Sequence, residues 1–165
     1  MKHVQIAFCP IILALTVGVY AQQLSSPNDQ AFVAKVSQGG RYEVEASKLA
    51  IQKAVAQDVK DIASSEVHDH ELVNAELKRI SIAKHVSIAP DLNAEFQGKL
   101  AQLKALNGSS FDAAYMSEMA TIHDKDEKLF AQEANDGGSV DFKNFAAATD
   151  RIVKRHIGAL HGLDH

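Results

Sequence analysis

The apolar residues of this chain recur every three or four positions over most of its length, which is the period of an amphipathic α-helix. No segment alternates apolar and polar residues in the manner of a β-strand. The pattern predicts four long helices and one short helix. Their expected ranges are Asp29–Ala54, Asp58–Lys84, Asp91–Leu106 (the short helix), Ser110–Ala134 and Val140–His161.

The segments between the helices indicate how the helices are arranged. Short turns follow the first and third long helices, the second of them at Gly137–Gly138, so each pair of helices is expected to be antiparallel. The segment from His85 to Gly108 is long enough to cross the bundle and includes the short helix, which Asp91 is expected to cap. The sequence therefore predicts an all-α fold, a ferritin-like four-helix bundle with a short crossover helix between the second and third long helices.

A glycine pair, Gly39–Gly40, interrupts the first predicted helix. Each glycine inside a helix costs about 1 kcal/mol relative to alanine. The helical pattern continues on both sides of the pair. Two explanations are open: the helix bends here, or a neighbouring helix approaches its backbone closely.

The first 21 residues follow a different pattern. Lys2 and His3 precede an apolar run from Val4 to Tyr20, and Val19-Tyr20-Ala21 resembles a cleavage site. These features predict a secretory signal peptide at residues 1–21 and an exported protein, periplasmic or secreted. A linker at 22–28, a bundle domain at 29–162 and a tail at 163–165 are expected to follow. The run is short for a transmembrane helix, so no membrane span is expected after cleavage.

Cysteine content and charge exclude several classes of function. Cys9 is the only cysteine and lies in the predicted signal peptide, which rules out disulfides and thiol chemistry in the exported chain. The 17 basic and 21 acidic residues are interspersed and give a formal net charge of −4. This distribution does not suggest a nucleic acid partner.

Four ionisable residues lie on the apolar sides of the four long helices: Glu43, His70, His123 and His156. Charged and polar side chains are normally excluded from such positions unless they are paired or bind a metal. Each residue lies near the middle of its helix, so all four are expected at a similar depth whichever way the helices run. The sequence therefore predicts that they converge in one layer of the core.

Three imidazoles and a carboxylate suit a single transition-metal ion, namely Zn, Cu, Ni or Fe. An imidazole that binds metal through one nitrogen needs a partner on the other. The expected orienting partners are Glu66, Asp69, Tyr115 and Asp126. No histidine has a glutamate three residues before it, so the Glu-x-x-His pairs of di-iron bundles are absent from the sequence.

A metal-free interpretation of the same residues is also open. Glu43 and the histidines can form a buried hydrogen-bonded network that fixes the packing of a structural or interaction module. No nucleophile turn and no phosphate-binding glycine loop is found, so no catalytic residue is predicted. His68 and His85 are expected to face solvent.

Several short motifs carry a family resemblance. They are Gly40 with Glu43-Val44, Asp69-His70, Phe111-Asp112 with Tyr115 and His123, and His156 in the last helix. With these residues the chain resembles a bacterial exported family, domain of unknown function 4142. The resemblance implies a ferritin-like bundle and no settled activity. Glu66 stands where family members usually carry an apolar residue, so an additional carboxylate is expected at this site.

Overall fold

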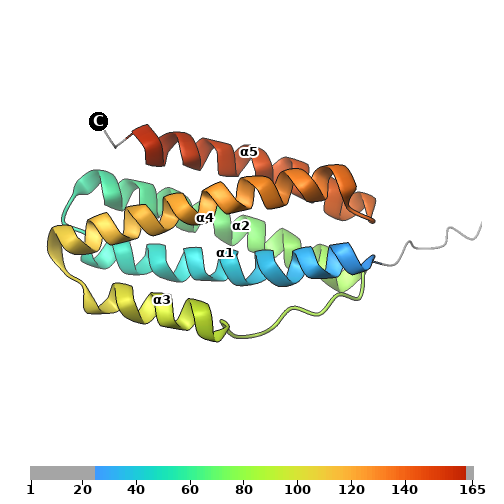
Figure 1. The fold of residues 1–165 in the computed structure, drawn as a ribbon, viewed down its shortest axis with the longest axis horizontal. Coiled ribbons are helices and arrows are strands. Elements are labelled where there is room, and N and C mark those ends of the chain that lie inside the picture. Colours follow the sequence, from blue (N-terminus) through green and yellow to red (C-terminus); the bar gives the residue numbers. More distant parts are fainter. Residues whose placement is uncertain (1–24, 163–165) are drawn as a thin grey trace, which may run out of the picture.

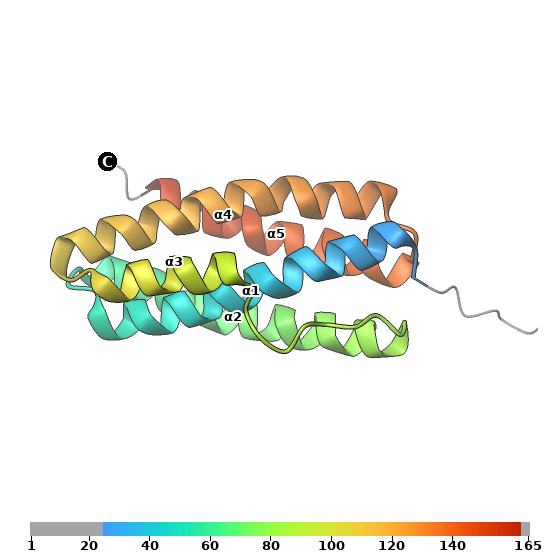
Figure 2. The ribbon, with the colours of Figure 1, turned by 60° about the horizontal axis from the view of Figure 1, so that its bottom comes forward.

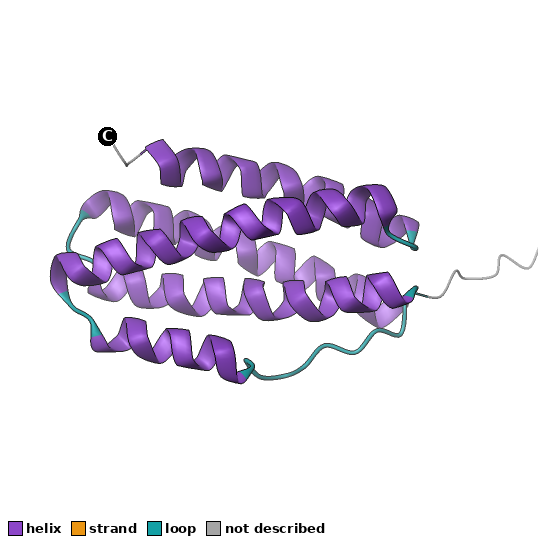
Figure 3. Cartoon of the chain, viewed as in Figure 1, coloured by secondary structure: helices purple, strands orange, loops and turns teal. Residues whose placement is uncertain are grey.

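The computed structural model describes residues 25–162, which form five α-helices and no strand (Figure 3). The predicted all-α class is confirmed, and each helix begins and ends within three residues of its expected bounds. The predicted signal peptide, residues 22–24 of the linker and the tail at 163–165 lie outside the described residues. The helices are α1 (Pro27–Lys53), α2 (Gln57–Ala83), α3 (Ala94–Ala105), α4 (Gly108–Asp136) and α5 (Val140–Gly162).

The four long helices lie side by side as two antiparallel hairpins, α1 with α2 and α4 with α5 (Figure 1). Helix α1 also packs against α4, and α2 against α5. The chain leaves α2 at one end of the bundle and returns along its length to α3, which lies against α1 (Figures 1 and 2). None of the five described helices combines the length and the apolar character that crossing a membrane requires.

The starts of the helices follow from their capping residues. Ser26 caps α1: its hydroxyl accepts from the Asp29 N–H at 3.1 Å, and the Asp29 carboxylate accepts from the Ser26 N–H at 2.6 Å. Asp91 is predicted to cap α3, and this prediction is wrong. Asn93 caps this helix instead, through the Phe96 N–H at 2.9 Å.

The later start of α3 has a physical cause in the Gln38 side chain of α1. Its amide N–H donates to the Asp91 carbonyl at 3.0 Å, and its carbonyl accepts from the Asn93 N–H at 2.7 Å. Both bonds hold the backbone outside the helix up to Asn93. The side chain of Gln38 is buried, so this tether is protected from water.

Helix packing explains the glycine at position 40, and backbone conformation explains the glycine at position 108. Helix α1 continues through Gly39–Gly40, and a Cβ atom at Gly40 would overlap the Asn74 side chain of α2. The close approach of a neighbour, one of the two alternatives for this pair, therefore explains Gly40. Gly108, the first residue of α4, has φ +59°, a left-handed conformation that glycine adopts at little cost.

Buried apolar side chains form two separate clusters, one toward each end of the bundle. One cluster includes Tyr42, Ala63 and Met119, and the other includes Val36, Val73 and Phe130. Between the residues of these two clusters, the helices carry the buried ionisable residues Glu43, Glu66, His70, His123 and His156. A polar layer in the middle of the bundle therefore divides the apolar core.

Candidate metal centre

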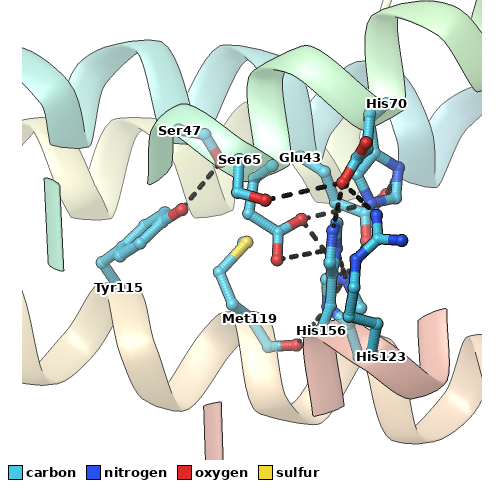
Figure 4. A network of polar contacts seen from close by, with 11 residues as sticks. Glu43, Ser47, Ser65, His70, Tyr115, Met119, His123 and His156 are labelled. Carbon is cyan, nitrogen blue, oxygen red and sulfur yellow. Dashed lines mark hydrogen bonds and ion pairs between the residues drawn. The ribbon is translucent and has the colours of Figure 1, made fainter. Parts of the chain in front are cut away.

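Side chains from three helices meet in the polar layer. Each of four residues offers one ligand atom, and these atoms all lie within 4.8 Å of one another. Each residue is no more than 3% exposed. Ligands at bond lengths near 2 Å lie up to about 4 Å apart, so a small contraction completes a coordination shell. The four residues are Glu66 and His70 from α2, His123 from α4 and His156 from α5. Figure 4 labels the three histidines.

Glu66 occupies the centre of this group. Its Oε2 atom lies 3.1 Å from His70 Nε2 and 3.3 Å from His123 Nε2. Its Oε1 atom lies 3.0 Å from His156 Nδ1. We call these three ring nitrogens the inner nitrogens, because all of them face the Glu66 carboxylate.

The other nitrogen of each ring, the outer nitrogen, has a partner outside the group. His123 Nδ1 lies 2.9 Å from the Met119 carbonyl oxygen, which can only accept a hydrogen bond. His156 Nε2 lies 2.8 Å from Asp69 Oδ2, and His70 Nδ1 lies 3.2 Å from Glu43 Oε2. The Met119 carbonyl and Asp69 favour protons on the outer nitrogens of His123 and His156, which turns their inner lone pairs toward the centre of the group. The Glu43 carboxylate lies close to the outer nitrogen of His70 but forms no hydrogen bond with it.

Two inner nitrogens are close enough to need a positive charge between them. His123 Nε2 and His156 Nδ1 lie 3.2 Å apart. With both outer nitrogens protonated, both inner atoms are acceptors and repel each other. A proton on one ring relieves this repulsion for one pair of atoms, whereas a metal ion relieves it for all three rings and Glu66 at once.

Some oxygen and nitrogen atoms of the group are buried without a hydrogen bond. They include Glu66 Oε2 and His70 Nε2. Glu66 Oε2 lies 3.1 Å from His70 Nε2 and 3.3 Å from His123 Nε2, so distance is not the obstacle. The atoms are misaligned for pairwise hydrogen bonds because they are directed at a shared volume. Buried polar atoms in this state are costly unless a cation satisfies them.

Comparison with known protein families shows which family the chain belongs to. The family described as "Domain of unknown function (DUF4142)" matches residues 16–163, which include every residue of the group. The chain belongs to the DUF4142 family. The resemblance carried by the sequence motifs is therefore confirmed.

The fold of this DUF4142 chain is shared beyond its own family. The crystal structure of a DUF305 fragment from Deinococcus radiodurans aligns with a TM-score of 0.75 at 10% sequence identity. The alignment covers 85% of this chain and 97% of that one. At this identity the likeness concerns the fold alone. No curated protein is similar to the chain in sequence.

The electrostatics of the group follow from its burial and its carboxylates. Burial alone would raise the pKa of Glu66, but the three imidazoles around it, when they are protonated, outweigh burial and lower the pKa. Burial alone would lower the pKa of His123, but contacts with Glu66 and Glu43 raise it to about 9. The pKa of His70 is raised for the same reason, chiefly by Glu43. The carboxylates thus draw positive charge into the site, and a divalent cation supplies the same charge.

The two glutamates lie differently from the sequence expectation. Glu43, expected as a ligand, lies outside the group of four and faces outer nitrogens, at 3.2 Å from His70 Nδ1 and 3.8 Å from His123 Nδ1. Glu66, expected as an orienting partner, lies inside the group. The cause is the direction of each side chain, which the helical pattern does not specify.

The other expected partners differ in what they contact. Asp69 accepts from His156, as an orienting partner does. The Tyr115 hydroxyl bonds Ser47 Oγ at 2.8 Å rather than a histidine. No hydrogen bond joins Asp126 to a histidine within residues 25–162, and burial together with Glu43 raises the pKa of Asp126 to about 8.

Two contacts of the site have no counterpart in the sequence analysis. The Met119 carbonyl orients His123, and Arg155 binds Asp69 at 2.6 Å. The first has a weak signal, because Met119 precedes His123 by one helical turn and a histidine can reach the carbonyl at that spacing. The second joins residues 86 positions apart and leaves no local signal.

Proposed function

We propose that this protein binds one transition-metal ion through Glu66, His70 Nε2, His123 Nε2 and His156 Nδ1. The observation that supports this ligand set is the convergence of four ligand atoms within 4.8 Å. The outer nitrogens of His123 and His156 are hydrogen-bonded to separate acceptors, and that of His70 lies close to the Glu43 carboxylate. In this proposal Glu43 and Asp69 orient histidines and are not ligands. Such partners raise the basicity of the imidazole and fix its direction.

The donor set restricts the class of metal. Three imidazoles and one carboxylate suit Zn(II), Cu(II), Ni(II) or Fe(II), and oxygen-seeking ions such as Mg(II) or Ca(II) prefer sites without imidazole. No sulfur ligand belongs to the set, which disfavours Cu(I). Zn(II) is the natural probe because it has no redox chemistry and accepts a tetrahedral shell.

The burial of the ligands favours holding a metal over catalysis. Four protein ligands fill a tetrahedral shell, whereas catalytic sites keep one position open for water or substrate. We therefore infer a role in metal storage, sensing or protection from metal stress, in a ferritin-like bundle. The signal-like N-terminus would place this role outside the cytoplasm, in the periplasm or beyond.

Metal analysis of matched variants tests the ligand set. Purified protein is incubated with Zn(II), desalted and analysed, and about one equivalent is expected per chain. The double variant His70→Ala/His123→Ala should lose this ion. The double variant His68→Ala/His85→Ala is the control, because both residues are exposed histidines and it should retain the ion. Equal zinc in all three proteins would overturn the ligand set.

Thermal melting separates this proposal from the metal-free network. A ligand that binds only the folded state stabilises it by about 2.7 kcal/mol at 100 times its Kd. Zn(II) should therefore raise Tm, and a chelator should reverse the rise. A bundle in which a shared proton alone joins His123 and His156 would melt at the same temperature under both conditions.

A further inference from the structure

The three histidines of the proposed centre differ in how far their outer nitrogens lie from solvent. The outer partners of His70 and His123 are Glu43 and the Met119 carbonyl, and both residues are buried. The outer partner of His156 is Asp69, whose side chain is 14% exposed. Among these three partners, only Asp69 reaches the surface.

One side chain covers Asp69 at this surface. Arg155 Nη2 lies 2.6 Å from Asp69 Oδ2, the same oxygen that accepts from His156 Nε2 at 2.8 Å. The Arg155 side chain is 59% exposed. Ser65 Oγ lies at the outer limit of hydrogen bonding, 3.5 Å from the same oxygen. A continuous chain of contacts therefore runs from Arg155 through Asp69 and His156 to Glu66.

We propose that Asp69 and Arg155 control the path by which a metal ion reaches and leaves the centre, with Arg155 acting as a cationic gate. This inference rests on the metal-binding function proposed above. A carboxylate at the surface attracts a hydrated dication, and from Asp69 only the His156 ring separates the ion from Glu66. Arg155 occupies the same carboxylate oxygen and repels the incoming charge.

The strength of the Arg155–Asp69 contact suits a gate that opens often. Ion pairs at a protein surface contribute about 0.2–1 kcal/mol, so thermal motion breaks them readily. The barrier that such a pair adds to metal exchange corresponds to a factor of roughly 1.4 to 5. Salt screens an exposed pair, so the barrier should shrink as ionic strength rises.

Stopped-flow kinetics with Zn(II) test the gate. Uptake is followed with a competing indicator, and release is followed by transfer to a chelator. Arg155→Ala should speed uptake and release by roughly 1.4- to fivefold at low salt, with Kd within about twofold of the original. Arg155→Lys, which keeps the charge, should stay near the original rates. Raising the salt concentration should narrow the difference between Arg155→Ala and the original protein.

Two further variants make the result specific. Arg151→Ala removes an exposed arginine one turn away on the same helix and should leave both rates unchanged. Asp69→Asn keeps an acceptor for His156, removes the attracting charge and should slow uptake several-fold. Unchanged rates in Arg155→Ala, or equal acceleration in Arg151→Ala, would overturn the gate while the metal site stands. Failure of the original protein to bind Zn(II) would overturn both proposals.

Discussion

Two groups of buried carboxylates differ in what surrounds them. At the start of α1, Asp29 is fully buried and accepts three backbone N–H groups: Ser26 at 2.6 Å, Gly138 at 2.8 Å and Ser139 at 3.2 Å. In the middle of the bundle, Glu66 faces three imidazole nitrogens that also face one another. The first carboxylate is satisfied by backbone donors, whereas the second faces three ring nitrogens that converge on the same volume.

A second aspartate shows that the first arrangement is structural. Asp112, near the start of α4, accepts the Val55 N–H at 3.2 Å and the Ala56 N–H at 2.9 Å. Each aspartate thus ties the start of one hairpin to the turn of the other, at opposite ends of the bundle (Figure 1). Donors and acceptors match at both ends. Burial of a carboxylate therefore does not by itself indicate a site; an excess of converging acceptors does.

The largest effect on stability is expected from removing the Asp29 carboxylate. Asp29→Ala leaves three backbone N–H groups without their acceptor, and each unsatisfied buried group costs about 1–3 kcal/mol. We expect the free energy of unfolding to fall by about 3–5 kcal/mol in urea denaturation. The folded fraction should still bind one equivalent of Zn(II). Loss of zinc from folded Asp29→Ala would show that the two groups are not separate.

The next effect distinguishes the two central glutamates. Glu66→Gln removes the proposed ligand charge and should weaken Zn(II) binding by more than about 100-fold, whereas Glu43→Gln removes an orienting partner and should weaken it roughly tenfold. Competition with a chelator of known affinity measures both. The reverse order would return Glu43 to the ligand role that the sequence suggested.

The smallest effect concerns pH and the neighbour of Asp29. Burial and the Asp29 carboxylate raise the pKa of Glu133 to about 7 from its ordinary value of 4.5. Between pH 4.5 and about pH 7, the Glu133 carboxyl group is therefore protonated in the folded state and ionised in the unfolded chain. This contribution favours the fold below about pH 4.5 and is lost as pH rises through about 7. The pKa of Asp29 is lowered, so its contribution is lost in the opposite direction, as pH falls into the acid range.

Glu133→Gln tests that sign directly. It removes the titratable carboxyl group of Glu133. The fall in the free energy of unfolding from pH 5 to pH 8 should therefore be smaller than in the original protein by about 1–2 kcal/mol. Urea denaturation at a series of pH values in the presence of a chelator isolates this effect from metal binding. Identical slopes in the two proteins would contradict the raised pKa of Glu133.

The helices and the central layer could be predicted because their signals are local. Apolar residues at helical spacing determine the inward side of each helix. A residue near the middle of a helix also lies near the middle of the bundle, whichever way the helix runs. The roles of Glu43 and Glu66 could not be separated in this way. Both lie on inward faces, and their roles depend on the direction of side chains packed against other helices.

The long-range contacts of Asp29 and Asp112 could not be read from the sequence, although Asp112 belongs to one of the family motifs. An acidic residue in the first turn of a helix, such as Asp29, is ordinary, because it favours the positive end of the helix dipole. Asp29 bonds the Gly138 N–H across 109 positions, and Asp112 bonds the Val55 N–H across 57. Only the folded chain brings these groups together. Arg155, whose partner Asp69 lies on another helix, escaped prediction for the same reason.

Anomalous diffraction at the zinc absorption edge, from crystals of the Zn(II)-loaded protein, tests the central claim most directly. The proposed centre predicts one strong peak in the polar layer, about 2.0–2.1 Å from His70 Nε2, His123 Nε2 and His156 Nδ1 and about 2.0–2.2 Å from a Glu66 oxygen. A zinc-loaded crystal with no peak between these three rings, or with its peak bonded to Glu43 in place of Glu66, would contradict the account.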